Sequence, residues 1–301
     1  MAASPAFFDP RNLAQFQGLE LRARRIVEGY VAGQHKSPYH GFSIEFAEHR
    51  EYVPGDDLRY VDWKVFGRTD KVYLKQFEEE TNLIVYVLLD GSRSMTYQGP
   101  GAAMSKLEYA QTVAASLTNL VLRQQDSVGL ATFDQQIRQV LPASGSPSQF
   151  NAVCRVLDQP GLAEKTAIGP IFHDLSERFK RRGIVIVLSD LFDDVNTMLA
   201  GLKHFRHRRH EVIVFQILDP AELDFPFRDP TIFKGLEAES PVVADPRGLR
   251  AAYLETFNAF LREVQTGCRS HHLDCVPLRT DQPMDVALSA YLAARGNRLR
   301  G

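Results

Sequence analysis

The sequence predicts an α/β protein built on a doubly wound, mainly parallel sheet flanked by helices, with an N-terminal extension. Two apolar runs, residues 83–89 and 184–188, have the composition of strands that are buried on both faces, and an aspartate follows each run closely. Between them, residues 105–125 carry apolar side chains at helical spacing, and Ser105 and Glu108 suit a capping box at the start of that helix. Buried strands that alternate with amphipathic helices are typical of this fold class.

The other segments continue this alternation. Residues 134–136 predict a hairpin turn between two neighbouring strands. Apolar runs predict further strands at residues 127–133, 137–141, 211–218, 241–244 and 273–278. Helical spacing of apolar residues predicts further helices at residues 11–33, 147–157, 171–182, 194–207, 246–266 and 283–295.

These patterns divide the chain into three parts. Residues 1–79 hold an N-terminal helix and a charged extension, residues 80–225 form the central α/β domain, and residues 226–301 add strands and helices packed on that domain. Most charges in residues 34–77 have a neighbour of opposite sign, so this segment either folds against the domain or presents its charges to a partner. Trp63 suits a buried anchor and a contact residue equally well. We expect part of the extension to pack beside the sheet edge.

The composition excludes several classes of protein. With 301 residues, 44% hydrophobic and 24% charged, the chain can bury a sizeable core like other soluble globular proteins. A net charge of -2 gives no general reason to expect nucleic acid or an anionic membrane as partner. The longest apolar runs are far shorter than the about 20 residues that span a bilayer, and residues 1–10 lack the pattern of a secretory signal. We therefore expect a cytoplasmic protein with no membrane span and no nucleic-acid partner.

Two clusters of histidine and cysteine have ordinary structural explanations. Cys268, His271, His272 and Cys275 could suggest zinc by residue type, but they lie in a predicted helix-to-strand turn without a second ligand pair. Residues 204–210 form a basic cluster at a predicted helix C-terminus, where the helix dipole favours positive charge without any ligand. We expect neither cluster to be the functional site.

The stronger candidate lies directly after the first buried strand. Asp90, Ser92 and Ser94 occupy alternate positions of a tight loop, where three short side chains can converge on a hard cation such as Mg²⁺. Asp190 ends the second buried strand, and ligands of open α/β sheets bind outside the carboxyl ends of the strands. Asp90 and Asp190 are therefore expected at one rim of the sheet. The alternative for the two serines is loop capping through hydroxyl-to-backbone hydrogen bonds.

These residues also carry a resemblance to known families. Asp-x-Ser-x-Ser after a hydrophobic strand resembles the metal-ion-dependent adhesion site of von Willebrand factor A domains, where a threonine and an aspartate from later loops complete the site. Thr166 and Asp190 match those positions. Residues 45–64, 67–71 and 77–81 resemble the signature of the bacterial domain-of-unknown-function 58 (DUF58) family. The combined resemblance covers roughly residues 35–220 of the printed sequence.

The resemblance implies a binding module rather than an enzyme. It implies metal ligation by Asp90, Ser92, Ser94, Thr166 and Asp190, with Mg²⁺ as the expected ion and Mn²⁺ or Ca²⁺ left open. In the resembled domains, a carboxylate from a partner protein completes the coordination of the metal. Proteins of this family are commonly associated with MoxR-type AAA+ ATPases, so the implied role is an adaptor or chaperone-like partner of such an ATPase and its client.

The alternative is a metal-dependent phosphohydrolase. A strand that ends in Asp90 could supply the nucleophile, but Ser92 stands where aspartate phosphatases carry their second carboxylate. Residues 91–95 also lack the second glycine of a hydrolase nucleophile elbow, and the sequence has no glycine-rich phosphate loop with Lys-Ser or Lys-Thr. We therefore expect no catalytic residues.

Overall fold

The computed structural model describes residues 8–34, 49–52, 65–67, 72–75, 83–159, 168–233 and 242–298. Its contacts divide the chain into two units, residues 33–82 and the remainder. In the smaller unit, β1 (His49–Glu51) pairs antiparallel with β2 (Tyr73–Lys75). Trp63 and most of the charged extension, including its predicted packing at the sheet edge, lie outside the described residues.

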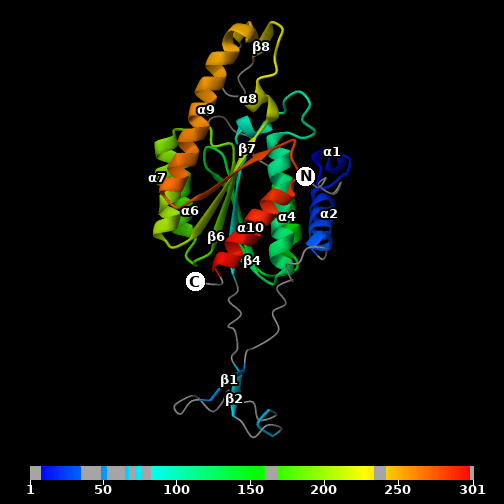
Figure 1. The fold of residues 1–301 in the computed structure, drawn as a ribbon, viewed down its shortest axis with the longest axis vertical. Coiled ribbons are helices and arrows are strands. Elements are labelled where there is room, and N and C mark those ends of the chain that lie inside the picture. Colours follow the sequence, from blue (N-terminus) through cyan, green and yellow to red (C-terminus); the bar gives the residue numbers. More distant parts are fainter. Residues whose placement is uncertain are drawn as a thin grey trace. The chain divides into compact units, whose positions relative to one another are not determined.

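The larger unit is built on a six-stranded sheet with the strand order β10-β7-β6-β3-β4-β5 (Figure 1). Neighbouring strands are parallel except for β5, which pairs antiparallel with β4. The strands are β3 (Ile84–Asp90), β4 (Ser127–Phe133), β5 (Ile137–Ser144), β6 (Ile184–Ser189), β7 (Glu211–Leu218) and β10 (Asp274–Arg279). The prediction of an α/β protein with a mainly parallel sheet flanked by helices is confirmed.

Helices cover both faces of the sheet, and β3 contributes to the core on each side. Its residues Val85, Val87 and Leu89 join one core, whereas Ile84, Tyr86 and Leu88 join the other, as the alternation of a strand requires. The first core includes α2 (Leu19–Gln34), α4 (Lys106–Arg123), α5 (Gln149–Leu157) and α10 (Asp285–Arg298). The second includes α6 (Ile168–Arg178), α7 (Val195–His207) and α9 (Pro246–Ser270).

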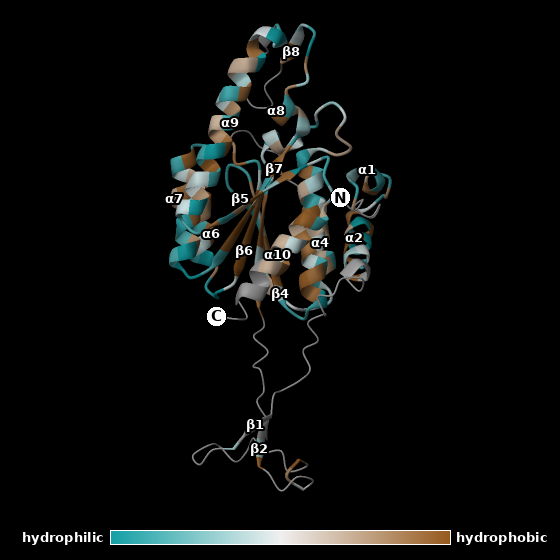
Figure 2. Ribbon diagram, in the orientation of Figure 1, coloured by the Kyte–Doolittle hydropathy of each residue, from teal (hydrophilic) through white to brown (hydrophobic). Residues whose placement is uncertain are grey.

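The colours of Figure 2 agree with this layering, because the strands are mainly hydrophobic and many helices carry both hydrophobic and hydrophilic residues. Within the described residues, every helix is too short or too polar to span a bilayer. The shorter elements are α1 (Pro10–Leu13), the 3₁₀ helix η2 (Arg93–Thr96), α8 (Pro220–Asp224), β8 (Thr231–Phe233) and β9 (Val242–Ala244).

Local capping explains where the helices beside the sheet rim begin. Ser105 and Glu108 form the predicted capping box at the start of α4. The predicted helix 171–182 instead begins at Ile168, because the Ile168 N–H donates to Asp193 Oδ2 at 2.7 Å. This cap comes from a residue far along the chain, so the local sequence pattern could not reveal it.

Close approach of α6 and α7 requires small residues. A Cβ at Gly169 would lie 2.6 Å from the carbonyl oxygen of Thr197, and one at Gly201 would lie 2.7 Å from the carbonyl oxygen of Gly169. Neither position therefore accepts a larger side chain without movement of the backbone. These contacts fix the two helices that flank β6 on one face of the sheet.

Candidate functional site

Asp90 ends β3 with its carboxylate buried and held by two neutral donors. The residue is 1% exposed. Its Oδ1 accepts from the Ser92 N–H at 2.8 Å, and its Oδ2 accepts from the Ser189 hydroxyl at 2.6 Å. One donor comes from the loop after β3 and the other from the end of β6, so the two neighbouring strands fix the carboxylate together.

The serines of the loop face one another rather than the backbone of the helix that follows. Ser92 Oγ lies 3.0 Å from Ser94 Oγ, and Ser92 is buried. Ser92 is also the N-cap residue of η2, yet its side chain makes no capping hydrogen bond. The loop-capping alternative is therefore not what the structure shows at Ser92, and two hydroxyl oxygens lie together beside Asp90.

Asp190 follows the end of β6, the neighbour of β3, and is 1% exposed. Its Oδ1 accepts from the Phe192 N–H at 3.1 Å, and its Oδ2 accepts from the Lys106 ammonium at 2.8 Å. Leu191, between Asp190 and Phe192 in the chain, adopts a left-handed backbone conformation with φ of 62°. Since β3 and β6 are parallel neighbours, both carboxylates lie at the same rim, together with Ser92 and Ser94. Thr166, the remaining predicted ligand, lies outside the described residues.

The structure adds two charged residues that the sequence analysis missed. Lys106, the first residue of α4, is 0% exposed, and its ammonium donates to Asp190 and, at 2.6 Å, to Glu222 Oε1 on α8. The Phe192 ring centroid lies 4.6 Å from the same ammonium. A buried ammonium is costly unless it is paired, and the two carboxylates supply that pairing.

Burial and neighbouring charges shift the pKa values of this cluster. Burial, reinforced by the Asp190 charge, raises the pKa of Asp90 to about 7, although the hydrogen bonds from Ser189 and Ser92 oppose the shift. Burial alone would lower the pKa of Lys106, but the charges of Asp190 and Glu222 outweigh it and the net shift is upward. Burial also raises the pKa of Glu222, against the Lys106 charge. When ionised, the described carboxylates of the rim therefore outnumber its one buried ammonium.

This donor set fits a divalent cation of the Mg²⁺ class. Asp90, Asp190 and Glu222 carry three negative charges when ionised, and Lys106 carries one positive charge, which leaves two negative charges to be balanced. Each Asp90 oxygen accepts one hydrogen bond in the structure, and a carboxylate oxygen can accept a further contact. Carboxylate and hydroxyl oxygens are the ligands that hard divalent cations prefer. Metal ligation by these residues stays a prediction.

Comparison with protein-family models matches residues 48–259 to a family described as "Protein of unknown function DUF58". This chain belongs to the DUF58 family. The family resemblance predicted from the residues upstream of β3 is confirmed. A relative of this DUF58 protein is the uncharacterized protein Rv1480 of Mycobacterium tuberculosis, 27% identical over 296 residues, or 95% of this chain and 90% of the relative. The uncharacterized protein YeaD of Bacillus subtilis is 25% identical over 176 residues, or 57% of this chain and 40% of YeaD.

Solved structures that resemble the DUF58 protein include a von Willebrand factor A domain. The conserved hypothetical protein BatB of Bacteroides thetaiotaomicron is 17% identical, covers 72% of this chain and 98% of its own, and has a TM-score of 0.49. The von Willebrand factor A domain of SpRpn10 is 13% identical, covers 69% and 94%, and has a TM-score of 0.39. These similarities assign no ligand or partner to this chain.

The histidine and cysteine clusters of the DUF58 protein are not arranged as a metal site. Among the residues that the structure describes, no three His, Cys, Asp or Glu side chains are grouped to hold a metal. Cys268 and His271 lie at the C-terminal end of α9 and Cys275 in β10, as the predicted helix-to-strand turn requires. The basic cluster lies at the C-terminal end of α7, where Arg208 pairs with Glu177.

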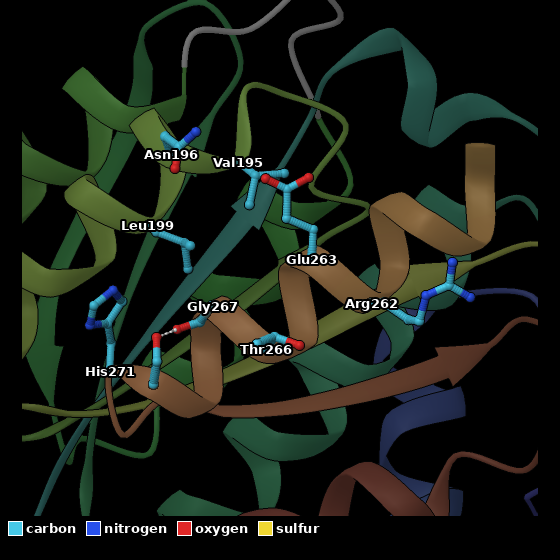
Figure 3. Close-up of a pocket in the computed structure, with 9 residues that line it drawn as sticks. Val195, Asn196, Leu199, Arg262, Glu263, Thr266, Gly267 and His271 are labelled. Carbon is cyan, nitrogen blue, oxygen red and sulfur yellow. Dashed lines mark hydrogen bonds between the residues drawn. The ribbon is translucent and has the colours of Figure 1, made fainter. Parts of the chain in front are cut away.

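A cavity of about 450 Å³ lies between α7 and α9 (Figure 3). None of the predicted metal ligands lines it. The two helices approach closely here, and Gly267 permits this because a Cβ at that position would lie only 2.2 Å from Leu199 Cδ1. In Figure 3, the Arg262 and Glu263 side chains point in different directions and do not converge on a common ligand. The rim with Asp90 and Asp190 therefore stays the better candidate for function.

Proposed function

We propose that this DUF58 protein is a metal-dependent protein–protein interaction module. The observation that supports the proposal is the rim where two buried carboxylates, Asp90 and Asp190, lie at the ends of neighbouring strands beside the Ser92 and Ser94 hydroxyls. A divalent cation held there by few charged ligands keeps an exchangeable position that attracts an outside carboxylate. Asp90, Ser92, Ser94, Thr166 and Asp190 would hold the ion, with Mg²⁺ favoured over Mn²⁺ or Ca²⁺.

Lys106 makes the rim suitable for an acidic partner. With the three carboxylates ionised, Lys106 and a divalent cation together bring the cluster to neutrality. A partner carboxylate would then approach a neutral cluster, whereas without the ammonium it would meet a net negative charge and be repelled. The chain's own contribution is thus to fix the ligands, exclude water from Asp90 and Asp190, and balance their charge.

The partner that we propose is a MoxR-type AAA+ ATPase, with the module acting in the cytoplasm as an adaptor between the ATPase and a client. The support for this partner is the family resemblance of the sequence. An adaptor binds without turnover, whereas a phosphohydrolase releases phosphate by itself. No observation at the rim favours hydrolysis, because Ser92 occupies the position of the second carboxylate that such chemistry needs.

Calorimetric titration of Mg²⁺ and Mn²⁺ into metal-free protein tests the proposal. We expect binding to the wild type and binding weaker by about a hundredfold or more to Asp90→Asn. Asp134→Asn is the matched control, because Asp134 is equally buried just after the neighbouring strand β4 but has its carboxylate paired with Arg138. Failure of the wild type to bind either ion would refute the metal-dependent module.

The partner is tested separately with a purified MoxR-type ATPase immobilised on beads. We expect it to retain the wild type in Mg²⁺, and to lose it with a chelator or with Asp90→Asn. Equal retention with and without the chelator would contradict a metal-bridged contact. Release of phosphate from a generic phosphomonoester by the wild type but not by Asp90→Asn would instead support the phosphohydrolase.

A further inference from the structure

An apolar pocket of about 480 Å³ lies between the N-terminal half of α9 and the chain that follows α8. Phe225 and Phe233 line it from the chain after α8, and Leu249, Ala252 and Tyr253 line it from α9. The Phe225 ring stacks on Phe233 at 5.8 Å and packs against Tyr253 at 4.6 Å between centroids. These rings give the pocket a wall that is already formed and apolar, as small apolar binding sites require.

The wall of this pocket includes an exposed apolar side chain. Leu249 is 46% exposed, whereas Ile232, 59% exposed, precedes Phe233 on β8 and therefore points to the opposite face of that strand. Apolar side chains gathered around a concave surface mark binding sites more often than single exposed residues do. The pocket is therefore a candidate contact surface for another molecule.

Hydrogen bonds connect the pocket to the candidate metal centre. The Tyr253 hydroxyl donates to the Glu222 carbonyl oxygen at 3.0 Å, and the Glu222 carboxylate accepts from Lys106, which also donates to Asp190. Burial, with the Glu222 charge, raises the pKa of Tyr253, so the hydroxyl stays a donor at neutral pH. A residue that lines the pocket is thus three hydrogen bonds from a predicted metal ligand, and both lie in the same structural unit.

Two guanidinium groups lie beside the pocket. Arg247 Nε donates to the Arg228 carbonyl oxygen and Arg250 Nη2 donates to the Asp224 carbonyl oxygen, each at 3.0 Å. Both bonds join α9 to the segment that contains Phe225. The acceptors are neutral carbonyls, so these two hydrogen bonds do not neutralise the guanidinium charges. A partner segment with acidic residues would be attracted to this edge.

We infer that the pocket receives a large apolar side chain from the same partner segment that offers its carboxylate to the candidate metal centre. The recognised segment would thus carry an acidic residue and, a few positions away, a phenylalanine or leucine. This inference rests on the proposed metal-dependent module and adds the chemistry of the partner. The pocket supplies apolar affinity, and the rim supplies the requirement for an acidic residue and a metal.

Short synthetic peptides test the inference with the full chain. Each labelled peptide carries one Asp and one Phe at varied spacing among Gly and Ser, and its matched peptides replace Phe by Ser or Asp by Asn. Binding is followed by fluorescence anisotropy in Mg²⁺ and in chelator. Ala252→Trp fills the pocket, and Ala251→Trp adds the same side chain to the exposed neighbouring position of α9, outside the pocket lining.

We expect peptides with both Asp and Phe to bind in Mg²⁺ and to bind about tenfold or more weakly after loss of Phe, loss of Asp, or Ala252→Trp. Ala251→Trp should bind as the wild type does. Leu249→Ser, which shortens an exposed side chain of the same wall, is a second variant with less risk to folding and should also weaken binding.

The remaining outcomes separate the inference from the function on which it rests. Asp peptides could bind only with metal and with the same affinity whether or not they carry Phe and whether or not the protein carries Ala252→Trp. That result would overturn the pocket inference and would still support the metal-dependent module. If a peptide needs its Phe for binding but binds equally well in Mg²⁺ and in chelator, the inference that one partner segment contacts both the pocket and the metal is overturned. If the calorimetric titration shows no ion binding, the proposed function fails first, and the inference fails with it.

Discussion

Asp90 ends β3 and Asp190 follows β6, both buried, yet the two carboxylates are held in opposite ways. Asp90, the last residue of β3, accepts from two neutral donors of the described part of the chain, Ser92 and Ser189. Asp190, after β6, accepts from the buried Lys106 ammonium, which binds Glu222 as well. Among the described residues, Asp190 has a cationic hydrogen-bond partner in Lys106, whereas Asp90 has none. We therefore expect Asp90 to govern cation binding and Asp190 to govern the structure around it.

The largest expected effect concerns Lys106, the counter-charge of Asp190 and Glu222. Lys106→Met would leave Asp190 and Glu222 buried without their partner, and we expect the free energy of unfolding to fall by about 3–5 kcal/mol. Urea denaturation measures the change, with the exposed Lys180→Met as control. Adding Glu222→Gln to Lys106→Met should recover part of the loss. A Lys106→Met protein as stable as the control would show that the ammonium is not needed.

The second prediction compares the two aspartates directly by Mg²⁺ titration. Asp90→Asn should weaken binding by about a hundredfold or more, because it removes a charge that has no cationic hydrogen-bond partner among the described residues. Asp190→Asn should weaken binding by only about tenfold, since Lys106 already offsets that charge. Equal losses in the two variants would contradict the division of roles between the carboxylates.

The third prediction uses the pH dependence of the metal-free protein. The pKa of Asp90 is raised from 3.8 to about 7, so the folded state holds a proton that the unfolded state releases. The contribution of Asp90 to stability is complete below pH 3.8 and is lost as pH rises to about 7. Between about pH 5 and 7, the wild type should lose about 2 kcal/mol relative to Asp90→Asn and level off above that range. Saturating Mg²⁺ should reduce the loss, and a pH-independent difference would refute the assignment.

The smallest expected effect concerns the cap that places Lys106. Ser105→Ala removes the capping box of α4, and we expect a loss of about 1 kcal/mol in unfolding free energy with a small decrease in Mg²⁺ affinity. Ser148→Ala is the control, because the side chain of Ser148 makes no cap at the start of α5. Denaturation and titration of both variants check this, and identical stabilities would show that the cap is dispensable.

The sequence predicted the six strands of the central sheet, most helices and the place of Asp90 and Asp190, since these depend on local runs of apolar residues. Lys106 could not be recognised, because a lysine in the first turn of an amphipathic helix is ordinarily solvated, and its burial here depends on β6 and α8. The helix α8 did carry a local signal. Asp219, Pro220 and Glu222 form a capping box with proline at the first turn, which would have placed Glu222 on a helix after β7.

The partners at the rim are far apart along the chain. Ser189 and Asp90 are separated by 99 positions, Lys106 and Glu222 by 116. A chain that is still emerging from the ribosome can fold early strands, but it lacks the donors and counter-charges that Asp90 and Lys106 need until residue 222 is available. The rim is thus completed late during synthesis, because a shorter chain lacks Glu222 and would bury Lys106 with one of its two carboxylate partners missing.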